Sequence, residues 1–287
     1  MPKFRWSKLW LLVGALIIAN IAAAAVLAQK GTRDYAEAYF FDVGQGDSIY
    51  IRTVEGNDVL IDGGPDSAVV SKLGRVMPYS DRKIELMIAT HPHADHIAGL
   101  VEVLKRFKVE KVLVSELIYP TETYKRFLEL LAENQSEIIR PKLGQRIFLD
   151  SQTVLDILYP VSGKFAKLPG DVNDASAVVR LSFGETNVLL TGDAGREIES
   201  FLMLNNLPLN SEILKVGHHG SKHSSENSFI KTVAPEYAVI QAGKDNNYGH
   251  PHEEVLRTLE ENNLEILRND QLGDIRFRLR PTGIEKF

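Results

Sequence analysis

Cysteine is missing from all 287 residues of this chain. Its absence excludes disulfide bonds, zinc sites built from thiolates and enzymes that use a cysteine nucleophile. Any metal site must therefore draw on histidine nitrogen and on carboxylate or amide oxygen. Hydrophobic residues make up 44% of the chain and charged residues 25%, which is ordinary for a globular protein with a substantial core.

The chain also has no excess of basic residues: it contains 33 lysines and arginines against 38 aspartates and glutamates. Three of the basic residues, Lys3, Arg5 and Lys8, lie at the extreme N-terminus, and the rest of the chain carries a net charge of about −8 without them. Broad nucleic-acid surfaces are usually basic. Any contact with DNA or RNA would have to be a local patch, and a high-affinity DNA-binding protein is disfavoured.

Charge is absent from Leu9 to Leu27, a run of 19 residues in which Asn20 is the one polar side chain. A helix of this length is about enough to cross a hydrocarbon core of roughly 30 Å, and it lacks the polar face of a buried core helix. The basic residues before it predict a cytoplasmic N-terminus, with the remainder outside. We expect residues 1–30 to be an uncleaved membrane anchor; cleavage after Ala28, which would give a secreted protein, is the alternative.

Short apolar or alternating runs follow a polar linker that ends near residue 36, and they predict β-strands separated by turns. In the first half we expect strands at 39–43, 48–52, 58–61, 86–89 and 111–114, and helices at 69–76, 97–107 and 122–133. In the second half we expect strands at 154–158, 177–181, 187–190, 213–216 and 237–241, a helix at 251–261 and two final strands. This order predicts two β-rich halves with helices outside.

The eight histidines fall into three short clusters, each just after a predicted strand or in a loop beyond one. They are His91, His93 and His96; His218, His219 and His223; and His250 and His252. Ordinary histidines would be spread along the chain, so the grouping indicates a site. Asp95 adds a carboxylate to the first cluster, and imidazole with carboxylate is a ligand set that borderline divalent cations accept.

The segment from His91 to His96 resembles the H-x-H-x-D-H signature of the metallo-β-lactamase superfamily. Three further residues match motifs of that family in the same order: Asp62 after a strand, Asp193 in a Thr-Gly-Asp-Ala turn, and His219 after a later strand.

Three longer segments are similar to the C-terminal hydrolase domain of the ComEC/Rec2 competence proteins. They are Phe41 to Ser48, Leu214 to Lys222 and Tyr248 to His252. The resemblance covers about residues 36–287. It implies an α/β fold, specifically an αββα four-layer sandwich, and a metal-dependent hydrolase.

The resemblance also implies two divalent metal ions, Zn²⁺ or Mn²⁺, for which nitrogen and oxygen ligands without sulfur are suitable. The expected ligands are His91, His93 and Asp193 for the first ion, and Asp95, His96, Asp193 and His219 for the second. Two ions about 3.5–4 Å apart would hold a bridging hydroxide at neutral pH. Asp62 would accept a hydrogen bond from a ligand imidazole and fix its tautomer.

One expected ligand is missing. The family usually has a histidine between its first cluster and the bridging aspartate, whereas no histidine lies between His96 and His218. Asp171, Asn173, Asp174 or water could fill that position, and one ion would then be bound more loosely.

Asp95 and His250 are the candidate catalytic residues, and His250 could donate a proton to a leaving group or bind phosphate. Asp47 is either a carboxylate that supports a ligand or a turn residue that caps its own loop. Gly44 and Gly46 would let the backbone pass close to the metal site.

The second histidine cluster leaves alternatives open. His218 could assist the second metal, contact substrate or only pack, and the loop with Ser221 and Lys222 either binds a phosphate or is simply solvated. We expect structural roles for His223 and His252, the latter at the start of a helix.

These features together predict an extracytoplasmic metal-dependent phosphodiesterase, with DNA as a candidate substrate. A single anchor cannot form the multi-helix channel of a complete competence protein, so DNA uptake itself is not predicted. One alternative is a hydrolase of another ester, lactone or amide, including a β-lactamase-like activity; the missing histidine argues against the zinc β-lactamase pattern. The other is a non-catalytic, surface-anchored metal-binding adaptor, which the nearly complete ligand set disfavours.

Overall fold

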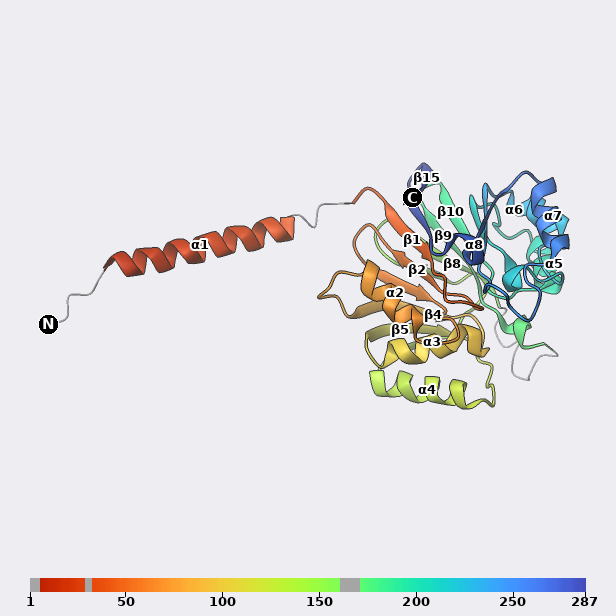
Figure 1. Ribbon diagram of the computed structural model, residues 1–287, viewed down its shortest axis with the longest axis horizontal. Coiled ribbons are helices and arrows are strands. Elements are labelled where there is room, and N and C mark those ends of the chain that lie inside the picture. The colour runs from red at the N-terminus through yellow and green to blue at the C-terminus, as the bar shows by residue number, and fades with distance from the viewer. Residues whose placement is uncertain (1–5, 29–32, 161–170) are drawn as a thin grey trace. The chain divides into compact units, whose positions relative to one another are not determined.

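The computed structural model describes residues 6–28, 33–160 and 171–287 and divides the chain into two compact units, Met1–Asp34 and Tyr35–Phe287 (Figure 1).

The first unit contains helix α1 (Trp6–Ala28), whose side chains are described from Trp10 to Ile21. Among the residues that the structure describes, no helix is both long enough and apolar enough to cross a membrane. Lys3 and Arg5, on which the expected orientation rests, lie outside the described residues.

The second unit is built around two mixed β-sheets. The strands of the first sheet are β1 (Ala36–Phe40), β2 (Ile49–Arg52), β3 (Asp58–Ile61), β4 (Lys83–Ala89), β5 (Lys108–Val114), β6 (Glu137–Ile139), β14 (Ile275–Arg280) and β15 (Gly283–Lys286). Those of the second are β7 (Arg146–Phe148), β8 (Thr153–Tyr159), β9 (Val178–Phe183), β10 (Thr186–Leu190), β11 (Ile213–Lys215), β12 (Tyr237–Ile240) and β13 (Glu265–Arg268).

The strand order is β15-β14-β1-β2-β3-β4-β5-β6 in the first sheet and β13-β12-β11-β10-β9-β8-β7 in the second. Strands β3 to β6 run parallel to one another, as do β10 to β13. The hairpin of β14 and β15 returns from the end of the chain and pairs with β1. Because parallel strands place their carboxyl ends at one edge, the loops that follow them gather side chains at that edge.

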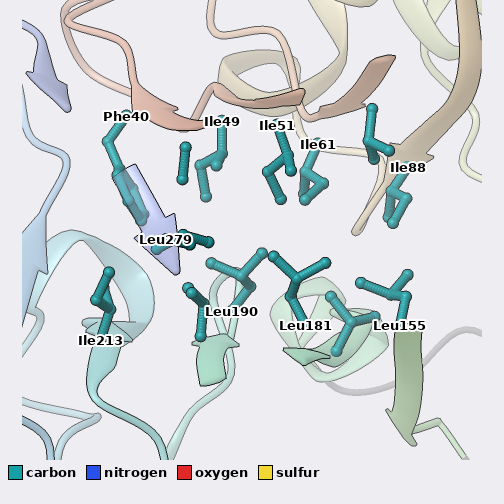
Figure 2. Packing of buried hydrophobic residues seen from close by; sticks show 14 of the residues in the cluster. Phe40, Ile49, Ile51, Ile61, Ile88, Leu155, Leu181, Leu190, Ile213 and Leu279 are labelled. Atoms are coloured by element: carbon teal, nitrogen blue, oxygen red, sulfur yellow. The ribbon is translucent and has the colours of Figure 1, made fainter. Parts of the chain in front are cut away.

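The main core lies between the sheets, where aliphatic side chains from both sheets point toward one another (Figure 2). This core forms because successive side chains along a strand point to opposite faces of the sheet. In β2, Ile49 and Ile51 belong to the core between the sheets, whereas Tyr50 packs on the opposite face with the helices. Leu181 and Leu190 supply the facing layer from the second sheet.

Helices cover the two outer faces and complete four layers (Figure 1). The first sheet packs against α2 (Ala68–Val76), α3 (Ala94–Leu104) and α4 (Glu122–Asn134). The second packs against α5 (Arg196–Leu204), α6 (Asn227–Val233) and α7 (Glu253–Glu261). Three short helical turns are η1 (Val172–Ala175), η2 (Gly217–Gly220) and α8 (Asn269–Leu272). The expected α/β architecture with two sheets and helices outside is confirmed.

The differences from the expected elements lie at their ends and at the sheet edges. β4 and β5 each begin three residues earlier than expected, at Lys83 and Lys108, because polar residues occupy their first positions. The strand expected at 39–43 ends at Phe40. The edge strands β6 and β7 were not expected, since three partly exposed residues give no apolar pattern.

A close backbone contact fixes the start of α3. The Gly99 N–H donates to the Gly64 carbonyl at 2.9 Å, and the Gly63 N–H donates to the His96 carbonyl at 2.7 Å. A Cβ atom at Gly99 would lie 1.8 Å from the Gly63 carbonyl oxygen, which is impossible without moving the helix. The contact therefore positions Asp95 and His96 in the first turn of α3.

Replacing Gly99 with alanine should lower the free energy of unfolding by several kcal/mol, because α3 must move off the turn after β3. Gly74 in α2 provides the matched control, since a Cβ there meets nothing within 4 Å and alanine should stabilise the helix by about 0.5–1 kcal/mol. Urea unfolding of both variants measures the difference. Equal stabilities would show that this contact does not position α3.

Candidate metal centre

The candidate site lies at the carboxyl ends of strands from both sheets. Asp47 follows β1, Asp62 follows β3, His91 to His96 follow β4, Asp193 follows β10, His219 follows β11 and His250 follows β12. The topology thus brings together residues that are up to about 200 positions apart in the sequence.

The carboxylate of Asp193 lies at the centre of this cluster. Its Oδ2 atom is 3.4 Å from Nε2 of His96, 3.4 Å from Nε2 of His219 and 3.9 Å from Nε2 of His91. The His219 Nε2 atom is also 3.4 Å from Oδ2 of Asp95. One carboxylate therefore faces imidazoles that come from β4 in the first sheet and from β11 in the second.

These atoms form overlapping groups that could hold metal ions. The groups are His91, His96 and Asp193; Asp95, His96 and His219; Asp47, Asp193 and His219; and Asp47, Asp62 and His96.

Within the described part of the chain, three buried polar atoms of this cluster lack a hydrogen-bond partner, which indicates that a cation fits among them. His96 Nε2, His219 Nε2 and Asp193 Oδ1 are buried and have no hydrogen-bond partner among the described residues. Buried polar atoms are almost always paired. Imidazole nitrogen and carboxylate oxygen that converge without partners are the donor set of a divalent metal site.

His93 is less closely grouped than expected. Its Nδ1 atom lies 3.0 Å from Nε2 of His91, and its ring contacts Tyr119 at 5.8 Å between centroids. Two nitrogens bound tetrahedrally to one zinc ion lie roughly 3.4 Å apart, so His91 and His93 are close to the spacing of a ligand pair. The structure nevertheless groups His91 and Asp193 with His96, not with His93.

The charge state of the cluster follows from its burial and its carboxylates. Burial alone would lower the pKa of His96 and of His219, but nearby aspartates, above all Asp193, raise both well above the usual value. Burial would raise the pKa of Asp193, but the two imidazolium groups hold it well below its usual range. Burial and the neighbouring His96 lower the pKa of His91. Without metal, the cluster is therefore neutralised by protons, which an incoming cation would displace.

Asp62 supports His96 from the side away from Asp193. Its Oδ2 atom accepts from His96 Nδ1 at 2.8 Å and from the Thr90 hydroxyl at 2.7 Å, and its Oδ1 atom accepts from the Thr90 backbone N–H at 2.9 Å. These contacts fix the carboxylate and leave His96 Nε2 directed at Asp193. An aspartate that holds a ligand ring in this way selects the tautomer for metal binding.

Behind His219 lie the Gln241 carbonyl and an ion pair of Asp47 with Lys215, a lysine that the sequence did not single out. The Gln241 carbonyl accepts from His219 Nδ1 at 2.8 Å. Asp47 Oδ1 lies 3.2 Å from the same nitrogen, and Asp47 Oδ2 forms an ion pair with Lys215 at 2.8 Å. The Lys215 side chain is fully buried and also donates to the Val216 carbonyl at 2.8 Å. The available signal was a charged residue inside an otherwise apolar strand. Asp47 is therefore part of the site's framework and not merely a turn residue.

Gly46 allows the loop after β1 to pass over the first histidine cluster. Its φ of +138° lies in the region that favours glycine, and a Cβ atom there would be 2.1 Å from the Asp95 carbonyl oxygen. The expected close approach of this loop to the site is present.

A cavity of about 490 Å³ opens onto the cluster. Its lining residues are Gln45, His93, Ala94, Asp95, Tyr119, Thr121, Thr123, Asn173, Asp193, His218, His219, Tyr248 and His250. Among Asp171, Asn173 and Asp174, all of which the structure describes, Asn173 alone lines it. Its Oδ1 atom is buried without a hydrogen-bond partner, and it lies in the part of the sequence where the missing histidine was expected.

His218 and His250 are neighbours on the cavity wall, with ring centroids 5.5 Å apart. His218 Nε2 lies 3.8 Å from Asp193 Oδ2. Burial, together with the nearby His219 and His218, lowers the pKa of His250 to about 4. At neutral pH His250 is therefore an uncharged imidazole, which can donate a hydrogen bond but carries no additional proton for a leaving group.

The structure does not bring Ser221 and Lys222 to the cavity wall. Ser221 is buried, and Lys222 lines a second cavity of about 310 Å³ with Arg196 and Ser224. The left-handed backbone of His218 and His219 explains this, because it turns the chain away directly after the two rings. His252 caps the start of α7 and its Nδ1 atom accepts weakly from the Lys222 backbone N–H at 3.3 Å.

Comparison with known proteins identifies relatives of this arrangement. The family model described as the metallo-beta-lactamase superfamily matches residues 41–244. ComE operon protein 3 of Bacillus subtilis is 31% identical over 262 residues, covering 85% of this chain and 33% of that protein. Competence protein ComA of Neisseria gonorrhoeae is 37% identical over 116 residues, covering 40% of this chain and 17% of that protein. The chain thus spans a third or less of the length of these relatives.

A solved structure shares the fold. CmlA, a diiron beta-hydroxylase from Streptomyces venezuelae, superposes with a TM-score of 0.55 at 14% identity, over 87% of this chain and 55% of CmlA.

The metal-free protein should lose stability as the pH rises above about 6.5. His96 and His219 have a higher pKa in the folded state than in the unfolded chain, so their contribution is present at low pH and is lost as the pH rises through the folded-state pKa. Thermal unfolding at pH 6 and pH 9, with and without Zn²⁺, measures this. Between pH 6 and pH 9, we expect the unfolding temperature of the metal-free protein to fall by several degrees more than that of the metal-loaded protein. An equal fall in both would contradict the raised pKa values of His96 and His219.

Replacing Lys215 with methionine should cost about 3–5 kcal/mol of folding free energy, because Asp47 loses its buried counter-ion. Adding Asp47→Asn should recover part of that loss. Denaturant unfolding of the two single variants and the double variant gives the coupling energy, and strictly additive effects would mean that the two side chains do not act as a pair.

Proposed function

This chain belongs to the metallo-β-lactamase superfamily, and from that membership we propose that it is a metal-dependent phosphodiesterase. The observation that carries the proposal is the buried Asp193 carboxylate, which faces unpartnered imidazole nitrogens of His96 and His219. A carboxylate has two oxygens and can serve two cations at once. The cluster is therefore suited to a pair of ions rather than to one.

The ligands divide between the two proposed ions. We assign His91, His93 and Asp193 to one, with the amide oxygen of Asn173 beside it, and Asp95, His96, Asp193 and His219 to the other. Zn²⁺ and Mn²⁺ both accept nitrogen and oxygen ligands. When bound, such ions supply Lewis-acid stabilisation and a nucleophile derived from water at neutral pH.

The other side chains position and hold the substrate. Asp62 and the Gln241 carbonyl fix the rings of His96 and His219. Neutral His250 can donate a hydrogen bond to a non-bridging phosphate oxygen, which stabilises negative charge without a proton transfer. This is the phosphate-binding role that the sequence suggested for His250 beside proton donation to a leaving group. Asp95 contributes as a ligand. Burial would raise the pKa of its carboxyl group, but the hydrogen bond with His219 and the charge of His96 lower that pKa below its usual range and keep Asp95 ionised.

The proposal of a phosphodiester, and of DNA in particular, rests on relatives that are named as competence proteins. The cavity supports it with donors on its wall, including Gln45, Thr121 and Thr123. Hydrolysis of a lactone, an ester or a β-lactam has no specific observation in its favour here.

We also propose that the N-terminal segment holds this domain outside the cytoplasm. The support is the uncharged run from Leu9 to Leu27 behind three basic residues. A fusion of alkaline phosphatase to Phe287 tests it, because the phosphatase folds only in an oxidising compartment. An inactive fusion at normal expression would contradict the outward orientation.

Asp193→Ala and Asp95→Ala should each reduce phosphodiester hydrolysis by at least about a hundredfold, because each removes a carboxylate from the cluster. The purified full chain, loaded with Zn²⁺ or Mn²⁺, should be assayed on single-stranded DNA, bis(p-nitrophenyl) phosphate and a chromogenic β-lactam in parallel. Glu137→Ala is the matched control, since Glu137 is exposed on the edge strand β6. Its activity should equal that of the wild type.

Two results would overturn the proposed function. One is β-lactam turnover without phosphodiester cleavage. The other is phosphodiester cleavage that survives in both aspartate variants.

A further inference from the structure

The aromatic ring of Tyr248 stands exposed at the cavity that contains the metal cluster. Its side chain is 66% exposed, although it lines the same cavity as Asp95 and Asp193. The ring lies nearly parallel to that of His250, with 5.7 Å between centroids and 19° between planes. A large aromatic ring that remains in water at the wall of a cavity has a surface available for another ring.

Asn246 makes most of the side-chain hydrogen bonds that hold the loop carrying this ring. The Asn246 Oδ1 atom accepts from the backbone N–H groups of Tyr248 at 3.1 Å and of His250 at 3.0 Å. Its Nδ2 atom donates to the carbonyls of Gly243 at 2.9 Å and of His250 at 2.6 Å. The Gly243 N–H in turn donates to Gln45 Oε1 at 3.1 Å, which fastens the loop to the cavity wall. The position of the ring is thus set before any ligand arrives.

The residues that line the cavity offer little positive charge for binding the phosphates of a nucleic acid. No lysine or arginine is among the described residues that line it. The whole chain carries a net charge of −5, so it offers little general attraction for a polyanion. Nucleic-acid binding usually draws most of its affinity from lysine and arginine on phosphates. A strand that binds here must gain affinity from another source, and base stacking on aromatic side chains is the usual one for single strands.

We propose that Tyr248, backed by His250, is a stacking platform for a nucleobase next to the scissile phosphate of a single-stranded nucleic acid. The proposal rests on the phosphodiesterase function proposed above and specifies its substrate. His250 lies between the platform and the cluster, with its ring centroid 6.1 Å from that of His219. A stacked base therefore sits within about one nucleotide of the cluster. Bases in a duplex are stacked on each other and cannot use the platform.

The test compares Tyr248→Ala with Tyr248→Phe in the metal-loaded full chain. The alanine variant should raise KM for a 12-residue thymidine strand about tenfold with little change in kcat, because stacking on one aromatic ring contributes roughly that much. The phenylalanine variant keeps the ring and should stay within about twofold of the wild type. Tyr79→Ala is the matched control, since Tyr79 is 94% exposed on a turn and does not line the cavity.

A second strand, in which abasic sites replace the thymidines, separates stacking from loss of fold. Its KM should be the same for Tyr248→Ala and for the wild type. Equal KM values for the thymidine strand in these two proteins would overturn the platform, as would equal weakening of both strands.

A binding measurement keeps this test independent of the proposed activity. Fluorescence anisotropy of the labelled thymidine strand should show about tenfold weaker binding by Tyr248→Ala than by the wild type, without any cleavage. If no strand is cleaved but this difference is found, the phosphodiesterase function fails and the platform stands. If the strand is cleaved but binds both proteins equally, the platform fails and the activity stands.

Discussion

The ion-pair network around Asp193 is the constraint on which the rest of this structure depends. A carboxylate that is buried in a protein costs several kcal/mol unless opposite charge and hydrogen bonds surround it. Here the compensating groups are His96, which comes from the first sheet, and His219, which comes from the second. The network therefore exists only when the two sheets are packed together. Folding and assembly of the site are one event in this architecture.

The two imidazoles nearest Asp193 are each held from behind through Nδ1. Asp62 accepts from Nδ1 of His96, and the Gln241 carbonyl accepts from Nδ1 of His219, with Asp47 Oδ1 3.2 Å from the same nitrogen. Two tight backbone approaches, at Gly46 and Gly99, bring the loops of the first sheet close enough for these contacts. The result is a pre-organised set of nitrogen and oxygen atoms, which lowers the reorganisation needed to bind cations and to act on a charged substrate.

Much of this site was predictable because most of its candidate metal ligands lie in short sequence motifs. The cluster from His91 to His96 lies within six residues, and a strand and a helix on either side place it at a sheet edge. Asp193 and His219 were predictable from the motifs around them. The α/β architecture followed from the order of the apolar runs.

What the sequence did not predict depends on contacts between distant segments. The ion pair of Lys215 with Asp47 joins β11 of the second sheet to the loop between β1 and β2 of the first, so neither residue alone indicates it. The loop with Lys222 was suggested either as a phosphate-binding loop or as a solvated one, and the left-handed backbone before it directs Lys222 to another cavity. Tyr248 was one of several residues in a matching motif, and its significance comes from its exposure at the cavity.

If Asp193 is shared by two cations, anomalous diffraction from crystals of the Mn²⁺-loaded protein should show two anomalous peaks, one on either side of the Asp193 carboxylate. The side chains of His91 and His93 should contact one of them, and those of His96 and His219 the other. A single peak, or a pair of peaks that Asp193 does not contact, would contradict the sharing of Asp193.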